Sequence, residues 1–375
     1  MTVSEEKKKK RRGVLICGAY GMGNAGDEAI LEAMVEEMRS IDPAMPITLL
    51  SRTPKATAAK FGVDALHTFN VPAFLHAARR AKLYLNGGGS LIQDVTSSRS
   101  LWYYLFTLAA AKHRGCRVLM YGCGIGPVLR PFDRRLAAHV IDRSVDAVTL
   151  REEDSLGELR SLGVTRPEIA VASDPALTLR PAAAAEIDEK MRLLGLEPAG
   201  DYLCFCLRSW PGWEEKLDCF ARAADYAYKA HGLTPVFLSV NILNDSGAAE
   251  AVAGRISAPR HIITESMPAS LTVGIISRMR AVVSVRLHGL IFAAGQGVPV
   301  AGVSYDPKVS AFLDAVGQDN YVSPEELTEE KLTMLIDRAL CADRQALRAA
   351  AGRLRERESL NTRTAEKLLR ETGES

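Results

Sequence analysis

The stretch AVVSVRLHGLIFAAGQGVPVAGVSYDP (residues 281–307), followed directly by Lys308, decides the fold. Its apolar run 281–285 predicts a buried parallel strand, 290–296 predicts a helix of small residues, and 298–303 predicts a second buried strand. A strand, a helix and a second strand in this order form a βαβ unit, from which parallel sheets are built.

Three basic side chains follow the two strands of this unit. Arg286 and His288 come directly after the first strand, and Lys308 comes just after the second. Ligands of open α/β sheets bind at the carboxyl ends of the strands. An arginine can hold a carboxylate or a phosphate through two hydrogen bonds, and a histidine titrates near neutral pH. A single histidine at such a junction more often has a structural role, but the three residues together favour a cationic site that can also move a proton.

The N-terminal half repeats the pattern of strand, loop and helix. Gly21, Gly23 and Gly26 have the G-x-G-x-x-G spacing between the predicted strand 13–18 and an amphipathic helix. The next strand, 47–50, is followed by no acidic residue that could hold a ribose, which argues against a nicotinamide dinucleotide. We expect the glycine turn to present backbone N–H groups to an anion or a hydroxylated ligand.

Further candidate residues follow other predicted strands. A strand at 81–85 leads into Asn86, Gly87, Gly88 and Gly89, where consecutive glycines indicate close approach of a ligand or of a helix; we expect ligand contact. Arg151 and Arg208 each follow a strand and are both eligible anion ligands. For Arg151, a salt bridge to the acidic residues 152–154 is an equally good explanation, and the sequence does not decide between the two arginines.

Repeated units of this size predict an α/β protein with two doubly wound, Rossmann-like domains that face a cleft. We place a basic, disordered tail at 1–12, the first domain at 13–180 and the second at 181–375, after an Ala-rich linker. The charged helical segment at the end of the chain could pack back onto the first domain.

Composition narrows the possible classes. The chain has 375 residues, a net charge of +2 and seven scattered cysteines without zinc-site spacing. We expect a soluble, cytoplasmic protein with reduced thiols, no secretory leader, no resident cofactor or metal, and no nucleic-acid partner. The basic tail could contact anionic lipid headgroups, so deleting residues 1–12 is expected to weaken vesicle binding at low salt.

Several motifs together resemble the polysaccharide pyruvyl transferase family. The similarity covers about residues 13–308. Its motifs are Asn24-Ala25-Gly26-Asp27-Glu28-Ala29-Ile30, Asn86-Gly87-Gly88-Gly89, Gly124-Ile125-Gly126-Pro127, Leu150-Arg151-Glu152-Glu153-Asp154-Ser155, Ser173-Asp174-Pro175 and Val285-Arg286-Leu287-His288-Gly289.

This resemblance implies a fold like that of two-domain glycosyltransferases of the GT-B type. It also implies transfer of a pyruvyl group from phosphoenolpyruvate to two hydroxyls of one sugar. In bacterial cell-wall members the acceptor is an N-acetylmannosamine of a lipid-diphosphate disaccharide, the linkage is a 4,6-ketal, and the product serves a secondary wall polymer that anchors surface-layer proteins.

The resemblance also assigns roles to residues of this chain. The family's donor-binding tripeptide matches Arg286, Leu287 and His288, and Lys308 matches a basic position after it. We expect His288 to be the general acid and base, Arg286 to hold the carboxylate or phosphate, and Lys308 to bind the leaving phosphate. The acceptor is expected on the first domain, at Gly23, Asn24, Gly26, Asp27, Asn86, Gly87, Gly88 and Gly89.

Two other functions remain open. A nucleotide-sugar glycosyltransferase has the same architecture but needs a carboxylate for the donor ribose, for which Glu265 is the one nearby candidate. A binding protein without chemistry would also keep the fold, although the set Arg286, His288 and Lys308 argues against it.

Overall fold

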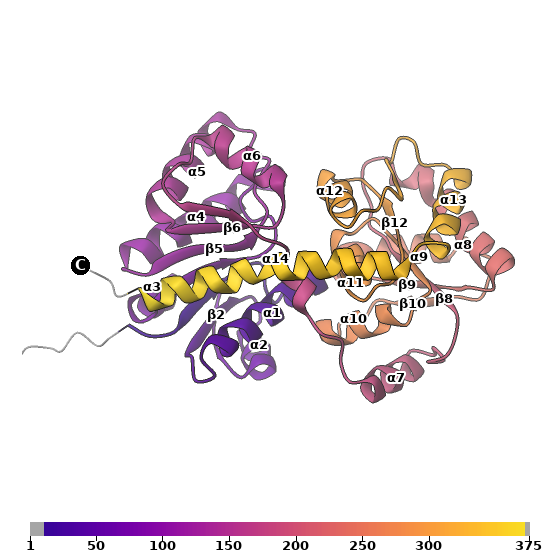
Figure 1. The fold of residues 1–375 in the computed structure, drawn as a ribbon, viewed down its shortest axis with the longest axis horizontal. Coiled ribbons are helices and arrows are strands. Elements are labelled where there is room, and N and C mark those ends of the chain that lie inside the picture. The colour runs from indigo at the N-terminus through magenta and orange to yellow at the C-terminus, as the bar shows by residue number, and fades with distance from the viewer. Residues whose placement is uncertain (1–10, 372–375) are drawn as a thin grey trace, which may run out of the picture. The chain divides into compact units, whose positions relative to one another are not determined.

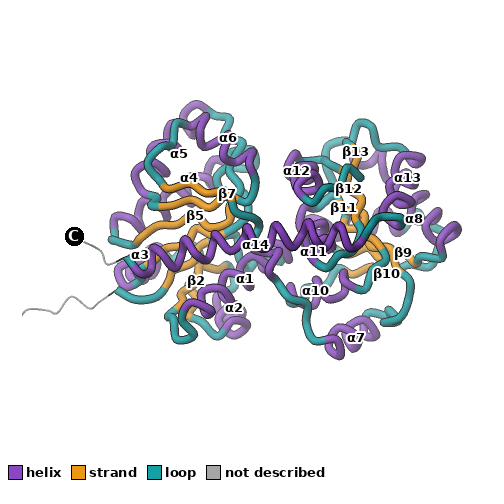
Figure 2. The backbone as a smooth tube through the Cα atoms, viewed as in Figure 1, coloured by secondary structure: helices purple, strands orange, loops and turns teal. Residues whose placement is uncertain are grey.

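The computed structural model describes residues 11–371, in which strands and helices alternate along the chain (Figures 1 and 2). The chain divides into two compact units. Unit 1 holds the described residues up to Met22, Ala33–Asp174 and the residues from Glu358 onward. Unit 2 holds Gly23–Glu32 and Pro175–Arg357.

Unit 1 is built on a parallel sheet whose described strands have the order β3-β2-β1-β4-β5-β6-β7. The strands are β1 (Val14–Cys17), β2 (Ile47–Ser51), β3 (Asp64–His67), β4 (Leu83–Gly87), β5 (Arg117–Cys123), β6 (Ala147–Leu150) and β7 (Glu168–Val171). The helices are α1 (Ala25–Ile41), α2 (Pro54–Phe61), α3 (Val71–Arg80), α4 (Ser98–His113), α5 (Pro131–Ser144) and α6 (Glu153–Leu162). Strands β1 and β4 are buried along their whole length, which is why they read as continuous apolar runs.

Unit 2 is built on a second parallel sheet, with the order β10-β9-β8-β11-β12-β13. The strands are β8 (Tyr202–Cys206), β9 (Thr234–Leu238), β10 (His261–Ile263), β11 (Ala281–Ser284), β12 (Val300–Val303) and β13 (Tyr321–Val322). The helices are η1 (Pro175–Thr178), α7 (Ala184–Leu193), η2 (Trp213–Lys216), α8 (Leu217–His231), α9 (Ile242–Ala253), α10 (Ala269–Ser277), α11 (Leu287–Gly295), α12 (Pro307–Ala315), α13 (Glu329–Leu340) and α14 (Arg344–Arg370). Helix α14 is the long yellow helix of Figure 1 and supplies residues to both units.

Each sheet has one point at which the order of its strands reverses. In unit 1 this point lies between β1 and β4, and in unit 2 it lies between β8 and β11. Ligands of doubly wound sheets bind outside the carboxyl ends of the strands at this point. The residues that follow these four strands are therefore the first candidates for a functional site.

The boundary between the units differs from the expected one at 180/181. It lies at Asp174/Pro175, and the segment Gly23–Glu32, expected in the first domain, belongs to unit 2. The amide of Ala25 donates to the carbonyl of Val240 at 2.7 Å, and Asn24 forms an isolated antiparallel β-bridge with Asn241. These hydrogen bonds join residues more than 200 positions apart, so no local sequence pattern reports them.

Both ends of the described chain are held in unit 1. Asn361 of α14 donates to the carbonyl of Ser173 at 3.0 Å. At the other end, the expected tail 1–12 lies mostly outside the described residues, but Arg11 donates to the carbonyls of Ala78 and Ala81 at 3.0 and 3.2 Å. Arginine suits the carbonyls left open at a helix end, here the end of α3.

Most expected elements are present with shifted ends, and some helices had not been expected. Helices α2, α3, α5 and α12 differ from the expectation, because each buries at most two apolar side chains and so gives a weak signal in the sequence. No helix among residues 11–371 is long and apolar enough to cross a membrane.

Candidate functional site

Strand β11 passes into α11 at the Arg-Leu-His tripeptide. The helix begins at Leu287, three residues before the expected start, and Arg286 is its N-cap. The hydroxyl of Ser284 accepts from the amide of Arg286 at 3.0 Å and donates to its carbonyl at 2.7 Å, which fixes the turn. A Cβ at Gly289 would lie 2.5 Å from that hydroxyl, so glycine is needed there. His288 is therefore placed by the first turn of a helix, whose free N–H groups favour an anion.

A buried carboxylate orients the guanidinium of Arg286. Nε of Arg286 donates to both carboxylate oxygens of Asp245 at 2.9 Å, and Nη2 also contacts that carboxylate. The Asp245 side chain is fully buried and accepts from the amide of Asn241 at 2.8 Å. Burial raises the pKa of Asp245, while Arg286 acts in the opposite direction. The bidentate contact uses one edge of the guanidinium and leaves Nη1 for a ligand.

Arg208 follows β8, on the other side of the strand-order reversal from Arg286. Its guanidinium carbon lies 4.5 Å from the centre of the Tyr305 ring, a cation–π contact. The Trp210 ring stacks on the Tyr305 ring, with 6.3 Å between the ring centres and 26° between the ring planes. Burial lowers the pKa of Arg208, and the positive charge of Arg286 lowers it further. The two arginines are thus close enough to repel each other, and an anion between them would relieve that repulsion.

The ring of His288 packs directly on the backbone of Gly26. A Cβ at Gly26 would lie 2.1 Å from Nδ1 of His288, so any side chain there would displace the ring. Gly26 is held in turn by Asn24, whose Oδ1 accepts from the Gly26 amide at 3.1 Å. Nδ2 of Asn24 donates to Asp27 at 2.6 Å. Three of the expected acceptor residues therefore lie in unit 2 and build the start of α1 beside the histidine.

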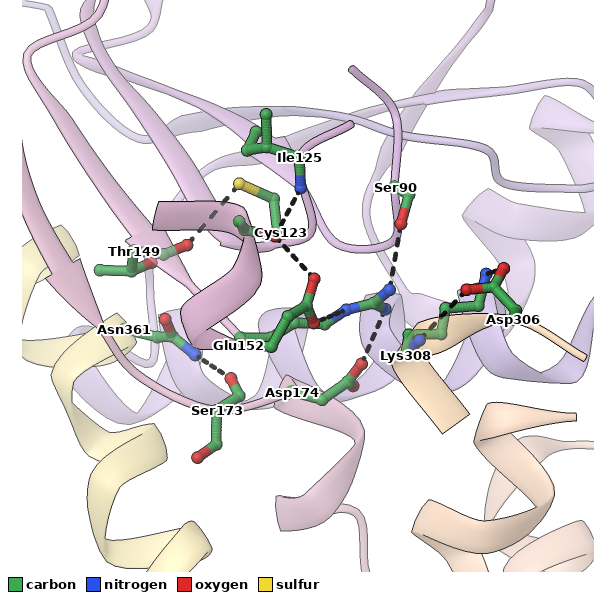
Figure 3. Close-up of polar contacts among 12 residues, drawn as sticks. Ser90, Cys123, Ile125, Thr149, Glu152, Ser173, Asp174, Asp306, Lys308 and Asn361 are labelled. Atoms are coloured by element: carbon green, nitrogen blue, oxygen red, sulfur yellow. Dashed lines mark hydrogen bonds and ion pairs between the residues drawn. The ribbon is translucent and has the colours of Figure 1, made fainter. Parts of the chain in front are cut away.

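Lys308 lies in the first turn of α12, just after β12. Its Nζ pairs with the Asp306 carboxylate at 2.8 Å, and its amide donates to the same carboxylate at 3.2 Å (Figure 3). Both side chains are about one-third exposed. Asp306 also acts electrostatically on Arg208, which places the Lys308 pair beside the arginines.

We call Arg208, Arg286, His288 and Lys308 the cationic cluster. All four follow strands of the unit 2 sheet at its carboxyl edge. The cluster offers two guanidinium groups, an ammonium group, a helix N-terminus and an imidazole. This set can bind a small molecule that carries two anionic groups and can transfer a proton to or from it.

Arg151 has a different environment, in unit 1 (Figure 3). Its Nε donates to Glu152 at 2.6 Å, Nη1 to Asp174 at 3.2 Å and Nη2 to Ser90 at 3.1 Å. Burial opposes its charge, but Glu152 and Asp174 outweigh burial and raise the pKa of Arg151. Two carboxylates therefore neutralise one buried guanidinium, which ties the Asn86–Ser90 loop to the end of β6.

The Asn86 side chain is an unusual polar group in unit 1. It is fully buried at the end of β4, and neither its amide nitrogen nor its oxygen has a hydrogen-bond partner among the described residues. Buried amides are normally satisfied, so this one suits a ligand or a water. The following glycines have conformational and packing roles. Gly88 and Gly89 have positive φ, and a Cβ at Gly87 would lie 2.5 Å from Sδ of Met34.

Sequence reasoning missed Asp245 and Tyr305, which orient the two arginines. Asp245 had been taken only as the start of a helix, and Tyr305 lies inside the quoted stretch without any motif. Neither has a local signal, because their roles depend on contacts across the sheet. Within residues 11–371, no group of three or more His, Cys, Asp or Glu side chains is placed to hold a metal ion.

A family model described as polysaccharide pyruvyl transferase matches residues 24–307. This range contains the motif that begins at Asn24, the Asn86 loop and the Arg-Leu-His tripeptide, and it confirms the family resemblance of the motifs. No curated protein sequence matches the chain.

Several solved structures with similar folds contain UDP or a UDP-sugar. HepE of Anabaena in complex with UDP-glucose has a TM-score of 0.62 and 12% identity, over 96% of this chain and 99% of that one. The UDP-GlcNAc 2-epimerase of Neisseria meningitidis bound to UDP-GlcNAc has a TM-score of 0.62 and 12% identity, over 96% and 100%. S. aureus MnaA with UDP has a TM-score of 0.61 and 10% identity, over 96% and 99%. At these identities the likeness shows the fold alone, and it confirms the expected GT-B-like α/β architecture.

Proposed function

Because the chain belongs to the polysaccharide pyruvyl transferase family, and is therefore a transferase, we propose that it moves the pyruvyl group of phosphoenolpyruvate onto two hydroxyls of one sugar. The observation that carries this proposal is the pairing of Arg208 and Arg286 at the strand-order reversal of unit 2, beside His288. Phosphoenolpyruvate has a carboxylate and a phosphate, and the cationic cluster has a separate group for each.

The donor would be held from two sides. Arg286, fixed by Asp245, binds the carboxylate through its open edge. Arg208 and the first turn of α11 face the phosphate, and Lys308 neutralises the phosphate as it leaves. Lys308 must shift from Asp306 toward the phosphate, a small movement for a partly exposed pair.

His288 supplies the proton chemistry. It donates a proton to the methylene carbon of phosphoenolpyruvate, which becomes the methyl group, while one sugar hydroxyl attacks the adjacent carbon and loses its proton. The C–O bond to phosphate then breaks, and the resulting oxocarbenium centre is attacked by the second hydroxyl, which also loses its proton. The leaving phosphate takes up the remaining proton, so the products are the cyclic ketal and inorganic phosphate in its hydrogen phosphate form. His288 alternates between acid and base through this sequence.

We assign the acceptor to a lipid-diphosphate-linked disaccharide with an N-acetylmannosamine, ketalised at O4 and O6 for a secondary wall polymer that anchors surface-layer proteins. The family resemblance supports this choice. Gly23, Asn24, Gly26 and Asp27, which lie in unit 2 with His288, are the proposed sugar contacts.

Between the two eligible arginines, local electrostatics favours Arg208 as the donor ligand. Arg151 already has two carboxylate partners, whereas Arg208 has an aromatic face and a second arginine beside it. Asp245 and Asp306 act on Arg208 without a direct ion pair, and a guanidinium without a direct carboxylate contact binds an anion better than one whose charge is already compensated.

The nucleotide-sugar alternative rests on Glu265 and on the UDP-sugar complexes of HepE and the epimerase. Glu265 is ion-paired with Lys190 and lines a cavity of about 20 Å³ with the buried hydroxyl of Ser239. Because the Glu265 carboxylate is already paired with Lys190, it is a weak candidate for holding a ribose, and this supports the pyruvyl donor.

The decisive experiment measures phosphate release from phosphoenolpyruvate, with and without a lipid-diphosphate GlcNAc–ManNAc acceptor. We expect acceptor-dependent release, reduced at least about 100-fold in His288→Ala, as is typical for loss of general acid–base catalysis. His139→Ala, an exposed histidine of unit 1, is the matched control and should keep full activity. Binding of phosphoenolpyruvate without release would point to another acceptor sugar, and no binding would reject the pyruvyl donor.

A further inference from the structure

Unit 1 exposes several large apolar side chains around the start of α4 and α5. Trp102 and Phe106 lie on one face of α4 and are 44% and 43% exposed; Val95, Leu129 and Phe132 are 63%, 66% and 63% exposed. The rings of Trp102 and Phe132 meet edge to face, 6.2 Å apart. We call these five residues the apolar patch. Contiguous exposed apolar groups on one face of a protein mark an interaction surface.

Positive charge surrounds the apolar patch. Arg99 lies one turn before Trp102 on α4, and Arg130 lies between Leu129 and Phe132; both arginines line the same open groove as Trp102 and Phe132. Within residues 11–371 neither arginine forms a salt bridge. The carboxylate of Asp94, which is buried, acts electrostatically on Arg130, and the buried Asp133 lines the same groove.

The charge imbalance extends over a long segment. Between residues 65 and 141 the sequence has ten basic residues: Arg79, Arg80, Lys82, Arg99, Lys112, Arg114, Arg117, Arg130, Arg134 and Arg135. The same segment has two acidic residues, Asp94 and Asp133, which are 3% and 1% exposed. Three of the ten are ion-paired with acidic residues outside the segment, Lys112 and Arg117 with Asp146 and Arg134 with Glu158. The excess positive charge beside the apolar patch therefore rests on Arg99 and Arg130.

Both buried carboxylates help to hold the apolar patch in place. Asp133 accepts from Nε1 of Trp102 at 2.7 Å and contacts the hydroxyl of Ser98. Asp94 accepts from the amides of Leu129 and Arg130 at 2.8 and 2.7 Å. The exposed Trp102 and the 129–132 segment are thus fixed by buried hydrogen bonds and are not loose surface groups.

We propose that the apolar patch, with Arg99 and Arg130, docks unit 1 on an anionic lipid bilayer. Aromatic side chains with a polar group suit the headgroup level of a membrane, and each nearby arginine adds attraction to anionic lipid. A bilayer explains charge of one sign around apolar groups, whereas a protein partner would need a matching acidic surface. The inference deepens the proposed function, because a lipid-linked acceptor lies in a membrane, but the docking itself does not depend on the reaction.

The test is sedimentation of the full chain with vesicles of phosphatidylcholine, with and without phosphatidylglycerol. The patch variant is Phe106→Ser/Phe132→Ser, which removes no side-chain hydrogen bond because phenylalanine has no polar side-chain group. Leu193→Ser/Met334→Ser removes exposed apolar groups from unit 2 and is its control. We expect the patch variant to lose at least about tenfold in vesicle partitioning, and the control to match the unchanged chain. Thermal unfolding of each variant checks that it is folded.

A second pair of variants tests the charge. Arg99→Glu/Arg130→Glu should remove the preference for phosphatidylglycerol, with a loss of about fivefold or more in vesicle partitioning per arginine. The control Arg192→Glu/Arg353→Glu has the same change in net charge and should keep most of this preference. A chain without residues 2–10 forms a separate arm, because the basic tail is an independent source of positive charge.

Equal vesicle binding by the unchanged chain and the patch variant would overturn the proposal, as would absence of any preference for anionic lipid. If the unchanged chain does not bind vesicles but forms a dimer, and the patch variant is a monomer, the surface would be assigned to a second copy of the chain. Phosphate release with a water-soluble acceptor separates the two proposals. We expect it unchanged in the patch variant, and a failure of that reaction leaves the vesicle result valid.

Discussion

At the scale of single residues, the position of the His288 ring depends on the absence of a side chain at Gly26. The ring fills the space that a Cβ would occupy, 2.1 Å from Nδ1. Gly26 also lies in the first turn of α1, where alanine has a higher helix propensity than glycine. Alanine at position 26 should therefore stabilise the helix but displace the His288 ring.

Gly26→Ala is thus expected to lower kcat at least about 100-fold, to the level of a general acid–base defect, with little change in thermal stability. The matched control is Gly247→Ala in α9, where a Cβ would meet nothing within 4 Å. Normal turnover in Gly26→Ala would show that the ring position is not needed for the reaction.

The two arginines that the sequence could not separate should respond differently to substitution. Arg208→Ala is expected to raise KM for phosphoenolpyruvate at least about tenfold without loss of stability. Arg151→Ala leaves Glu152 and Asp174 uncompensated in unit 1 and should lower the free energy of unfolding by about 3–5 kcal/mol.

Steady-state kinetics and chemical unfolding of both variants make this comparison. Arg151→Lys and Arg208→Lys are the conservative partners, since lysine keeps the charge but loses the fork geometry. A stable Arg151→Ala with a raised KM would transfer the donor role to Arg151.

At the scale of elements, the middle of α14 places the buried carboxyl group of Glu358 in unit 1, close to Glu37 of α1. Glu358 is 2% exposed and accepts from Asn361 at 2.9 Å, and Tyr121 of β5 donates to Glu37 of α1. Burial and the charge of Glu37 raise the pKa of Glu358 to about 9. The folded chain therefore holds a proton on Glu358 at pH values where the unfolded chain has released it.

The sign of the pH dependence follows from this raised pKa. Between the ordinary value of 4.5 and about 9 the folded state binds more protons, so stability falls as pH rises. The effect of Glu358→Gln on the free energy of unfolding should be more favourable at pH 8.5 than at pH 5. The difference between the two pH values should be at least about 1.4 kcal/mol, which corresponds to a shift of one pKa unit. Urea unfolding at both pH values measures this, with the exposed Glu356→Gln as control. Parallel pH profiles for the two chains would contradict it.

At the scale of the whole molecule, ligand-induced stabilisation distinguishes the candidate functions without an acceptor. Phosphoenolpyruvate at 100 times its Kd should stabilise the chain by about 2.7 kcal/mol, whereas UDP-glucose should not stabilise it. His288→Ala should keep most of this stabilisation, and Arg286→Ala should lose it. Thermal unfolding is the measurement. Stabilisation by UDP-glucose alone would favour a nucleotide-sugar enzyme, and no shift with either ligand would favour a binding protein.

Much of the fold could be predicted because its signals are local. The segments 281–283 and 202–206 are continuously apolar because both faces of their strands are buried, and the intervening amphipathic segments are helices. Helices α2, α3, α5 and α12 were missed because each buries at most two apolar side chains.

Sequence alone determined the two-domain α/β class and the placement of Arg286, His288 and Lys308 at the carboxyl ends of strands. These follow from periodicity and from short motifs, which depend on neighbours along the chain. Tertiary structure alone decided that Asp245 orients Arg286, that Gly26 makes room for His288, and that the glycine turn belongs to unit 2. Each of these rests on contacts between segments 40 to more than 200 residues apart, whose pairing depends on the packing of the whole chain and leaves no local pattern.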